Sequence, residues 1–263
     1  EHLTVGFISL GCPKNRVDSQ IMADALLADG IRLAPSPEEA DLIIINTCAF
    51  IEDARAESVE AIQSACRLKS EGRCRAILVA GCLSQRYRDE LRRSLPDVDG
   101  FIGLDELQKV AAVARRLGRG EAGIVDISPT AQRLFEPQQP GVVFSTGSYA
   151  YVKIAEGCNH RCTFCAIPGI RGAFRSRPVE AIVREAESLL ERGFRELDLI
   201  SQDVTSYGRD RADGSDLPGL LRALGRLRGE FWIRLLYGYP SHITDALLEA
   251  MAETPAVCRY LDL

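Results

Sequence analysis

Long apolar runs are missing from this 263-residue sequence. No stretch approaches the roughly 20 consecutive apolar residues of a membrane-spanning helix, which excludes a membrane role for the sequence as given. The first residues, Glu-His-Leu-Thr, also lack the basic segment and apolar core of a secretory signal. We therefore expect a cytoplasmic protein.

A net positive charge is also lacking, and histidine is scarce. The formal net charge is −5, so a nucleic-acid partner would need a local basic patch or another domain. The three histidines, His2, His160 and His242, form no set with the paired spacing of a zinc site. The composition, 46% hydrophobic and 26% charged, is ample for one or two packed domains.

Cysteine, by contrast, is plentiful, and three of the nine cysteines lie close together. Cys158, Cys162 and Cys165 have the spacing C-x3-C-x2-C, directly after an apolar run at residues 150–155. A [4Fe–4S] cluster normally takes four thiolates, so three cysteines with no fourth nearby would leave one iron open to a non-protein ligand. The spacing therefore predicts an iron–sulfur cluster at which chemistry takes place.

A second set of cysteines follows three apolar runs. Cys12, Cys48 and Cys82 lie 36 and 34 residues apart, and each comes just after a run of apolar residues. A strand, a crossover helix and the next strand take roughly 30 residues or more, which suits successive parallel strands. Because the carboxyl ends of such strands share one edge, we expect the three sulfurs to converge on a second cluster site.

Zinc binding, disulfide bonds or simple burial could also account for cysteines in a chain of this kind. Zinc usually takes four ligands with paired spacings, which this sequence lacks. Disulfides are disfavoured in a cytosolic chain, and burial alone does not explain C-x3-C-x2-C. Cys66 lies on a helical apolar pattern with Val59 and Ile62, which favours core packing. Cys74 and Cys258 carry no ligand pattern and are expected to be structural.

Strands alternate with helices along the whole chain, which predicts an α/β fold. We expect an amino-terminal doubly wound parallel sheet in residues 1–127, a Pro- and Gly-rich linker in 128–148, and a partial (β/α) barrel in 149–263. The expected strands are residues 5–10, 42–45, 77–80, 151–155, 197–201, 232–237 and 260–263; the expected helices are 18–28, 54–69, 86–94, 106–117, 179–192, 217–227 and 243–252. A closed barrel typically needs about 250 residues, so we expect a fragment of a longer protein that stops at a fourth, unpaired barrel strand.

Several motifs resemble a known family. The C-x3-C-x2-C loop with Phe164 before its last cysteine resembles the radical S-adenosylmethionine superfamily, and the upstream cysteines resemble its methylthiotransferase branch. The stretches that resemble the RimO type of that branch are Gly11-Cys-Pro-Lys-Asn15, Asn46-Thr-Cys-Ala-Phe-Ile51, Glu156-Gly-Cys-Asn-His-Arg-Cys162, Ile200-Ser-Gln-Asp203 and Tyr239-Pro-Ser-His-Ile-Thr244. That type modifies an aspartate of small-subunit ribosomal protein twelve.

The resemblance implies two [4Fe–4S] clusters, S-adenosylmethionine and an external electron donor. The cluster at the C-x3-C-x2-C loop would bind S-adenosylmethionine and cleave it to a 5′-deoxyadenosyl radical. The cluster at Cys12, Cys48 and Cys82 would present the sulfur that becomes a methylthio group. The product would form on the β-carbon of an aspartate in the ribosomal protein, free or in the ribosome.

Cofactor-binding candidates come from the same resemblance. Phe164 is expected to pack against the adenine, with core packing as its alternative. Ser201, Gln202 and Asp203 follow the second barrel strand, where βα barrels place catalytic groups, and are expected to bind the cofactor's amine or ribose. Loop turn chemistry is their alternative. No catalytic residue is predicted beyond the cluster ligands.

Further expectations concern three arginines and two asparagines. Arg171, Arg175 and Arg177 form a basic cluster in sequence that could meet a carboxylate, unless they lie in a solvated loop. Asn15 and Asn46 flank cluster cysteines and are expected to donate to a cluster.

Two alternative functions stay open at this point. The first is a tRNA adenosine methylthiotransferase of the MiaB type, which the acidic balance and the Gly-Cys-Pro-Lys-Asn stretch disfavour. The second is a non-enzymatic iron–sulfur module, which would normally have every iron bound by protein.

Overall fold

The computed structural model describes residues 3–134, 141–145 and 147–263, and these form two compact units. The first unit comprises residues up to 133 together with 161–171, and the second comprises 134–160 and 172–263. Part of the expected linker, residues 135–140 and 146, lies outside the described residues. The expected domain boundaries stay predictions.

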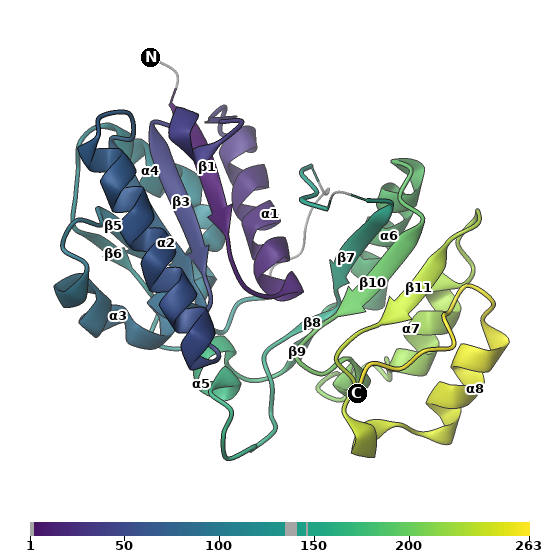
Figure 1. Cartoon of the computed structure of the whole chain (residues 1–263). Coiled ribbons are helices and arrows are strands. Elements are labelled where there is room, and N and C mark those ends of the chain that lie inside the picture. Colours follow the sequence, from purple (N-terminus) through teal and green to yellow (C-terminus); the bar gives the residue numbers. More distant parts are fainter. Residues whose placement is uncertain (1–2, 135–140, 146) are drawn as a thin grey trace. The chain divides into compact units, whose positions relative to one another are not determined.

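The first unit contains a six-stranded, fully parallel sheet with the strand order β2-β1-β3-β4-β5-β6 (Figure 1). Its strands are β1 (Thr4–Ser9), β2 (Arg32–Leu33), β3 (Leu42–Thr47), β4 (Ala76–Gly81), β5 (Gly100–Ile102) and β6 (Ile124–Asp126). Every residue of β3 and β4 is buried, as expected for central strands of a parallel sheet covered on both faces. The order places β1, β3 and β4 side by side.

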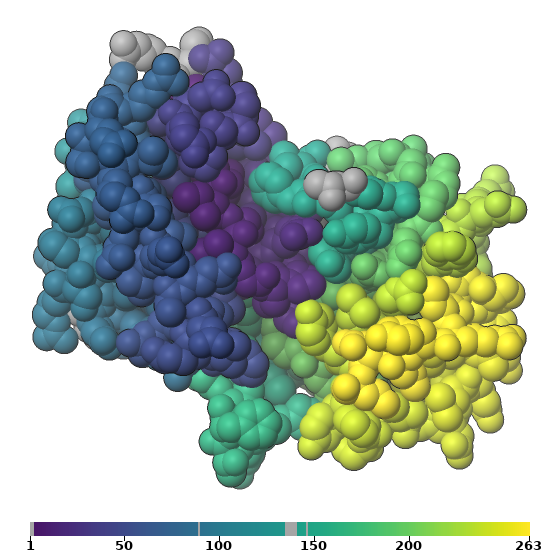
Figure 2. Space-filling model, in the orientation of Figure 1, coloured from purple at the N-terminus to yellow at the C-terminus, as the bar shows by residue number. Residues whose placement is uncertain are grey.

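Helices connect these strands and cover the sheet. They are α1 (Pro13–Ala28), α2 (Glu52–Ser70), α3 (Cys82–Ser94) and α4 (Val110–Gly118), with short 3-10 helices η1 (Pro37–Glu39) and η2 (Leu104–Lys109). A further short helix of this unit, α5 (Ile167–Arg171), comes from the later segment 161–171. Ile62 of α2 and Leu83 of α3 pack into one core cluster with Ile43 and Ile77 of the sheet. The outer face of α2, blue in Figure 2, forms part of the surface of this unit.

Helix α1 begins five residues earlier than the sequence predicts. Cys12 is its N-cap and Pro13 its first residue, a position that tolerates proline because that N–H has no intrahelical partner. Asp18 and Ser19, the polar residues at the start of the expected helix, instead lie inside it and are buried. The predicted start at residue 18 is therefore wrong, because residues 13–16, Pro-Lys-Asn-Arg, carry no apolar periodicity.

The second unit contains a three-stranded parallel sheet in the order β11-β10-β7 and a small antiparallel pair, β8-β9 (Figure 1). The strands are β7 (Tyr149–Lys153), β8 (Ala155–Glu156), β9 (Arg175–Ser176), β10 (Glu196–Ile200) and β11 (Trp232–Leu235). The helices are α6 (Val179–Glu191), α7 (Leu217–Leu224) and α8 (Asp245–Glu253), with 3-10 helices η3 (Val204–Ser206) and η4 (Pro240–His242). One core cluster joins the sheet to all three α-helices.

The expected strand at residues 260–263 is wrong. After α8 only one isolated parallel bridge forms, between Ile233 and Val257. Asp262 instead accepts hydrogen bonds from the backbone of Tyr237 and Gly238, which lie beyond the end of β11. Residues 258–263 form no strand, and the last residues lie at the surface of this unit, yellow in Figure 2.

The α/β class and the parallel first sheet are confirmed. Strands β2, β5 and β6 were not predicted, since two or three residues are too few to show a pattern. Among the described residues, none of the helices combines the length and the apolar character needed to cross a membrane.

Candidate iron–sulfur and cofactor sites

Three cysteines of the first unit follow three neighbouring strands. Cys12 caps α1 after β1, Cys48 comes directly after β3, and Cys82 is the first residue of α3 after β4. The strand register aligns the ends, because Asn46 of β3 pairs with Ser9 of β1 and with Ala80 of β4. The three cysteines therefore share the carboxyl edge of the sheet, and two of them stand at helix amino termini, which stabilise thiolates.

Electrostatics shows the same proximity. Burial raises the pKa of the Cys82 thiol to about 12, the charge of Arg171 opposes this, and Cys12 and Cys48 raise it further. Cys82 is 5% exposed and Cys48 7%. All nine cysteines are free. The structure thus brings Cys12, Cys48 and Cys82 together as thiols, a donor set that suits iron; their role as cluster ligands stays a prediction.

Two glycines allow this close approach. Gly11 has a φ of 83°, and a Cβ there would lie 2.7 Å from the Cβ of Cys48. Gly81 has a φ of 93°, and a Cβ there would overlap the side-chain oxygen of Asn46. Positive φ costs glycine little, so both strand ends can turn sharply into the cysteine that follows.

Asn15 and Asn46 brace these turns. The Asn15 amide donates to the carbonyls of Leu10 and Thr47, at 3.2 and 2.8 Å. Asn46 donates to the carbonyl of Asn15 at 2.6 Å, and its own buried Oδ1 has no partner among the described residues. Their amide N–H groups therefore bond the backbone and, for Asn46, also Oγ of Ser19 at 2.9 Å, and the expected donation to a cluster stays a prediction.

Arg171, at the end of α5, is buried in the same place. Its Nη2 donates to Oδ1 of Asn15 at 2.7 Å and to Oδ2 of Asp18 at 2.8 Å, and lies 3.4 Å from Sγ of Cys82. Arg171 is 1% exposed. A solvated loop position is therefore wrong for this residue, and sequence reasoning missed that the segment after the C-x3-C-x2-C loop supplies a cation to the other cysteine set.

Arg177 is also buried rather than solvated. Its guanidinium donates to Glu185 at 2.6 Å and to the carbonyl of Lys153 at 2.7 Å. Burial raises the pKa of Glu185, and the charge of Arg177 opposes that rise. Like Arg171, it has an acidic partner within its own unit, so a shared basic patch for an external carboxylate finds no support in these contacts.

The C-x3-C-x2-C loop starts at a tight turn in the second unit that requires glycine. Gly157 has a φ of 81°, and a Cβ there would overlap the carbonyl oxygen of Ala173. The next residue, Cys158, is 8% exposed and donates its N–H to the carbonyl of Gly172 at 3.1 Å. Cys162 and Cys165 are half-buried, and the N–H of Cys165 donates to the carbonyl of Cys162 at 3.0 Å.

The cofactor-binding candidates differ in availability. Phe164 is 84% exposed, so core packing is wrong for it and its ring is free for a cofactor. Gln202 donates to Glu156 at 2.9 Å, while its buried Oε1 has no partner among the described residues. Ser201 is fully buried, and its Oγ accepts from the N–H of Asp203 at 3.1 Å. The cofactor contacts of all four candidates stay predictions.

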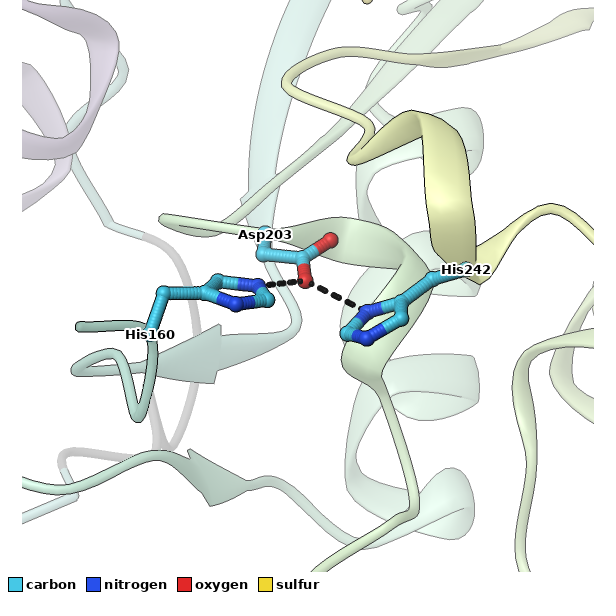
Figure 3. A group of neighbouring side chains, drawn as sticks. All are labelled: His160, Asp203 and His242. Carbon is cyan, nitrogen blue, oxygen red and sulfur yellow. Dashed lines mark hydrogen bonds and ion pairs between the residues drawn. The ribbon is translucent and has the colours of Figure 1, made fainter. Parts of the chain in front are cut away.

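Asp203 is the centre of a hydrogen-bond network that sequence reasoning missed. Its Oδ2 accepts from Nε2 of His160 at 2.8 Å and from Nδ1 of His242 at 3.0 Å (Figure 3). Ser206 and Thr205 also donate to the carboxylate. Burial alone would raise the pKa of Asp203, but hydrogen bonds from Ser206, Thr205 and the two histidines outweigh it and hold the pKa below its ordinary value. The sequence held one signal for this network: His160 and His242 both lie in motifs that follow strands, where side chains from different strands can meet.

A hollow of about 830 Å³ lies at the opposite edge of the second sheet. It is lined by residues that precede β10 and β11, among them Arg195 and Phe231. Active sites of parallel βα sheets lie at the carboxyl edge instead, where the cysteine loop and Asp203 are. We assign this hollow no role.

Two family models match the chain. Residues 4–103 match the uncharacterized protein family UPF0004, and the matched segment contains Cys12, Cys48 and Cys82. Residues 152–262 match the radical SAM superfamily, which includes the C-x3-C-x2-C loop.

Curated relatives match over nearly the whole chain. The ribosomal protein uS12 methylthiotransferase RimO of Trichlorobacter lovleyi is 47% identical over 98% of the chain and 58% of that protein. The RimO of Geobacter sulfurreducens is 44% identical, again over 98% of the chain and 58% of that protein. The chain therefore spans a little over half the length of these relatives.

Solved structures share the fold at low identity. The radical S-adenosylmethionine methyltransferase TsrM from Kitasatospora setae, with a tryptophan substrate and a SAM analog bound, has a TM-score of 0.59 and 14% identity over 96% of this chain and 57% of that chain. The cobalamin-dependent radical enzyme OxsB, with aqua-cobalamin and S-adenosylmethionine bound, has a TM-score of 0.58 and 12% identity over 96% of this chain and 42% of that chain.

These matches place the chain in the radical S-adenosylmethionine superfamily. Within it, the chain belongs to the methylthiotransferase family and to its RimO type. The family predicted from the sequence motifs is thereby confirmed.

Proposed function

We propose that this protein transfers a methylthio group to the β-carbon of an aspartate in small-subunit ribosomal protein uS12. The observation that carries the proposal is the presence of two separate three-thiol sets. One follows β8 on the C-x3-C-x2-C loop, and the other follows β1, β3 and β4 on one sheet edge. A radical enzyme that only cleaved S-adenosylmethionine would need the first set alone.

The two cofactors have defined places in this proposal. When bound, a [4Fe–4S] cluster at Cys158, Cys162 and Cys165 supplies the electron that cleaves S-adenosylmethionine, and a second one at Cys12, Cys48 and Cys82 holds the sulfur that is transferred. The second cluster is supported by the shared edge of the three thiols and by Arg171, which places a positive charge beside Cys82. Three thiolates in a buried site need such compensation.

The chain's own residues would bind and orient the cofactor. The unpartnered Oε1 of Gln202 is a buried acceptor beside Glu156, suited to the α-amine of S-adenosylmethionine. Phe164 offers an exposed ring for the adenine. Ser201 and Asp203 are engaged with neighbouring residues, so we propose that they shape the pocket wall next to Gln202.

The partners follow from the same proposal. The substrate would be uS12, alone or in the ribosomal subunit, and an external donor would supply electrons in the cytoplasm. The RimO relatives are named for uS12, which favours a protein substrate over tRNA.

The test compares two substrates directly. The protein, reconstituted anaerobically with iron and sulfide, is incubated with S-adenosylmethionine, dithionite and either uS12 or tRNA, and both are analysed by mass spectrometry. We expect one methylthio group on an aspartate of uS12 and none on tRNA. Modified adenosine in tRNA would instead support the MiaB type, and iron binding without any cleavage of S-adenosylmethionine would support a non-enzymatic iron–sulfur module. A Cys162→Ala variant is the control that should give neither product.

A further inference from the structure

We propose that Asp203 is a positioning residue: through His160 it fixes the loop segment that carries Cys158. The proposal deepens the proposed function and rests on the cluster at the C-x3-C-x2-C loop. It gives Asp203 a role through a neighbouring side chain rather than through contact with the cofactor.

His160 is held from two sides. Its backbone N–H points at Sγ of Cys158 at 3.4 Å. Its ring donates to Asp203 at 2.8 Å and lies against the ring of Tyr239, with centroids 4.1 Å apart and planes tilted by 31°. A residue fixed at both its backbone and its ring leaves the neighbouring cysteine little freedom.

The network ties this loop to the ends of two strands. Asp203 follows β10, and Tyr239 and His242 follow β11. His242 donates to the same carboxylate oxygen as His160, and the two rings lie 5.0 Å apart (Figure 3). A reactive site is held most accurately when its supporting residues sit on rigid elements, and here the support comes from the parallel sheet.

The protonation pattern is consistent with this role. A carboxylate only accepts hydrogen bonds, so the nitrogens that face Asp203 carry protons, Nε2 on His160 and Nδ1 on His242. Asp203 is 2% exposed, and a buried carboxylate is stabilised when its oxygens are fully hydrogen-bonded. Both oxygens are occupied: Oδ1 by Thr205, and Oδ2 by Ser206 and the two rings.

A bound metal ion would use the same side chains in a different way. The ligand atoms of His160, Asp203 and His242 all lie within 4.8 Å of one another. An ion would need Nε2 of His160 and Nδ1 of His242 without their protons and would displace Ser206 from Oδ2, whereas the observed contacts already occupy both oxygens of Asp203. The contacts favour the hydrogen-bond network.

A positioning role predicts a change in the reduction potential of the cluster in addition to any effect on the stability of the protein. Hydrogen bonds to cluster sulfurs tune the reduction potential of the cluster. Release of His160 from Asp203 would move the N–H that faces Cys158, and the potential should shift. A purely structural role would change the melting temperature and leave the potential of the assembled cluster unchanged.

The test uses variants at His160 that differ only in the donor. His160→Gln keeps an N–H at the position of Nε2, whereas His160→Leu has a similar size and no donor. Both variants also carry Cys12, Cys48 and Cys82 changed to Ala and are then reconstituted, so that only the cluster of the C-x3-C-x2-C loop is observed. Asp210→Asn is the matched control, because Asp210 accepts hydrogen bonds from Ser176 and does not touch the loop.

We expect His160→Leu and Asp203→Ala to shift the midpoint potential in the same direction and by similar amounts. His160→Gln and Asp210→Asn should leave it unchanged. The double variant His160→Leu/Asp203→Ala should shift no further than either single variant, since both remove one interaction.

Three outcomes would overturn the proposal. The first is an unchanged potential in His160→Leu, and the second is additive shifts in the double variant. The third is stoichiometric Zn²⁺ binding by the cluster-loaded protein that is lost in His242→Asn. In each of these three outcomes the unmodified protein still assembles its cluster, so the proposed function stands. If the unmodified protein failed to assemble a cluster on the loop, the positioning role and the proposed function would both be overturned.

Discussion

Arg171 and Asp18 form an ion pair in the interior of the first unit. Nη2 of Arg171 lies 2.8 Å from Oδ2 of Asp18, and the two side chains are 2% and 1% exposed. The same nitrogen also reaches Asn15 and Cys82. The pair thus anchors α5 to α1 beside the cysteines that follow β1 and β4.

Arg171→Met should be strongly destabilising. The change removes the guanidinium that faces the carboxylate of Asp18, and breaking a buried ion pair by removing one member typically costs about 3–5 kcal/mol. We expect the free energy of unfolding of the iron-free protein, measured by urea denaturation, to fall by roughly this amount. Iron bound at Cys12, Cys48 and Cys82 should be lost as well.

Arg115→Met is the matched control. Arg115 pairs with Asp29 on the surface, where both side chains are nearly half exposed, and such pairs contribute less than about 1 kcal/mol. If both substitutions lowered the free energy of unfolding equally, the buried pair would contribute no more to stability than the surface pair. Arg171→Met with Asp18→Asn should recover part of the loss, because the carboxylate that faced Arg171 is then removed together with the guanidinium.

Gly157→Ala should disrupt the cysteine loop. Gly157 has a positive φ, and an added Cβ would overlap the carbonyl oxygen of Ala173, which neither backbone can avoid without moving. Gly193 also has a positive φ, 97°, but nothing lies within 4 Å of an added Cβ there. Gly193→Ala should therefore lower the free energy of unfolding only by roughly 1–2 kcal/mol, the cost of placing an alanine in the left-handed conformation.

The measurements are thermal unfolding and iron content after reconstitution. Gly157→Ala should lower the melting temperature more than Gly193→Ala and should lose the cluster of the C-x3-C-x2-C loop. Equal losses in the two variants would mean that the contact with Ala173 does not constrain the loop.

The sequence was sufficient for the elements that repeat a pattern. Strands β3 and β4 were predicted because four or more consecutive apolar residues precede a cysteine at nearly the same offset. The same offset predicted that Cys12, Cys48 and Cys82 share a sheet edge, since parallel strands end on one side. The short strands β2, β5 and β6 were missed because they contain too few residues to show a periodic pattern of apolar side chains.

The contacts between distant residues could not be predicted. Arg171 and Asp18 are 153 residues apart, and His160 and Asp203 are 43 apart. Neither pair has a local sequence signal, because each depends on how two segments pack after folding. The cysteine spacing shows what a site binds, whereas the side chains that support it come from tertiary structure.

Asp198→Asn should stabilise the protein at neutral pH. Burial raises the pKa of Asp198 to about 6, Glu196 adds to the rise, and Arg234 opposes it. The folded-state pKa lies above the ordinary value of about 3.9, so this group's contribution to stability is full below pH 4 and is lost as the pH rises through 6. Asparagine carries no charge, so it avoids that loss.

The check is urea unfolding of both proteins at pH 4 and at pH 7.5. We expect Asp198→Asn to be more stable at pH 7.5 by an amount on the order of 1–3 kcal/mol, with most of the difference gone at pH 4. A difference of the same size at both pH values would show that the carboxyl group does not titrate as described.

The iron content should match two clusters. Anaerobically reconstituted protein is expected to bind about eight irons, since we propose a four-iron cluster at each three-cysteine set. Changing Cys158, Cys162 and Cys165 to Ala should remove about half of the iron and all cleavage of S-adenosylmethionine. An iron count near four in the unmodified protein would contradict the two-cluster proposal.

The two clusters should also be separable by activity. With Cys12, Cys48 and Cys82 changed to Ala, the protein should still form 5′-deoxyadenosine from S-adenosylmethionine but transfer no methylthio group, because the two sets share no ligand. The control changes Cys66, Cys74 and Cys258 to Ala. Cys66 and Cys74 pack in or against the core of the first unit, and Cys258 is half-buried, so both activities should persist. Loss of 5′-deoxyadenosine formation in the first variant, while the spectrum of its remaining cluster stays intact, would show that the radical step also depends on the cysteines of the first sheet.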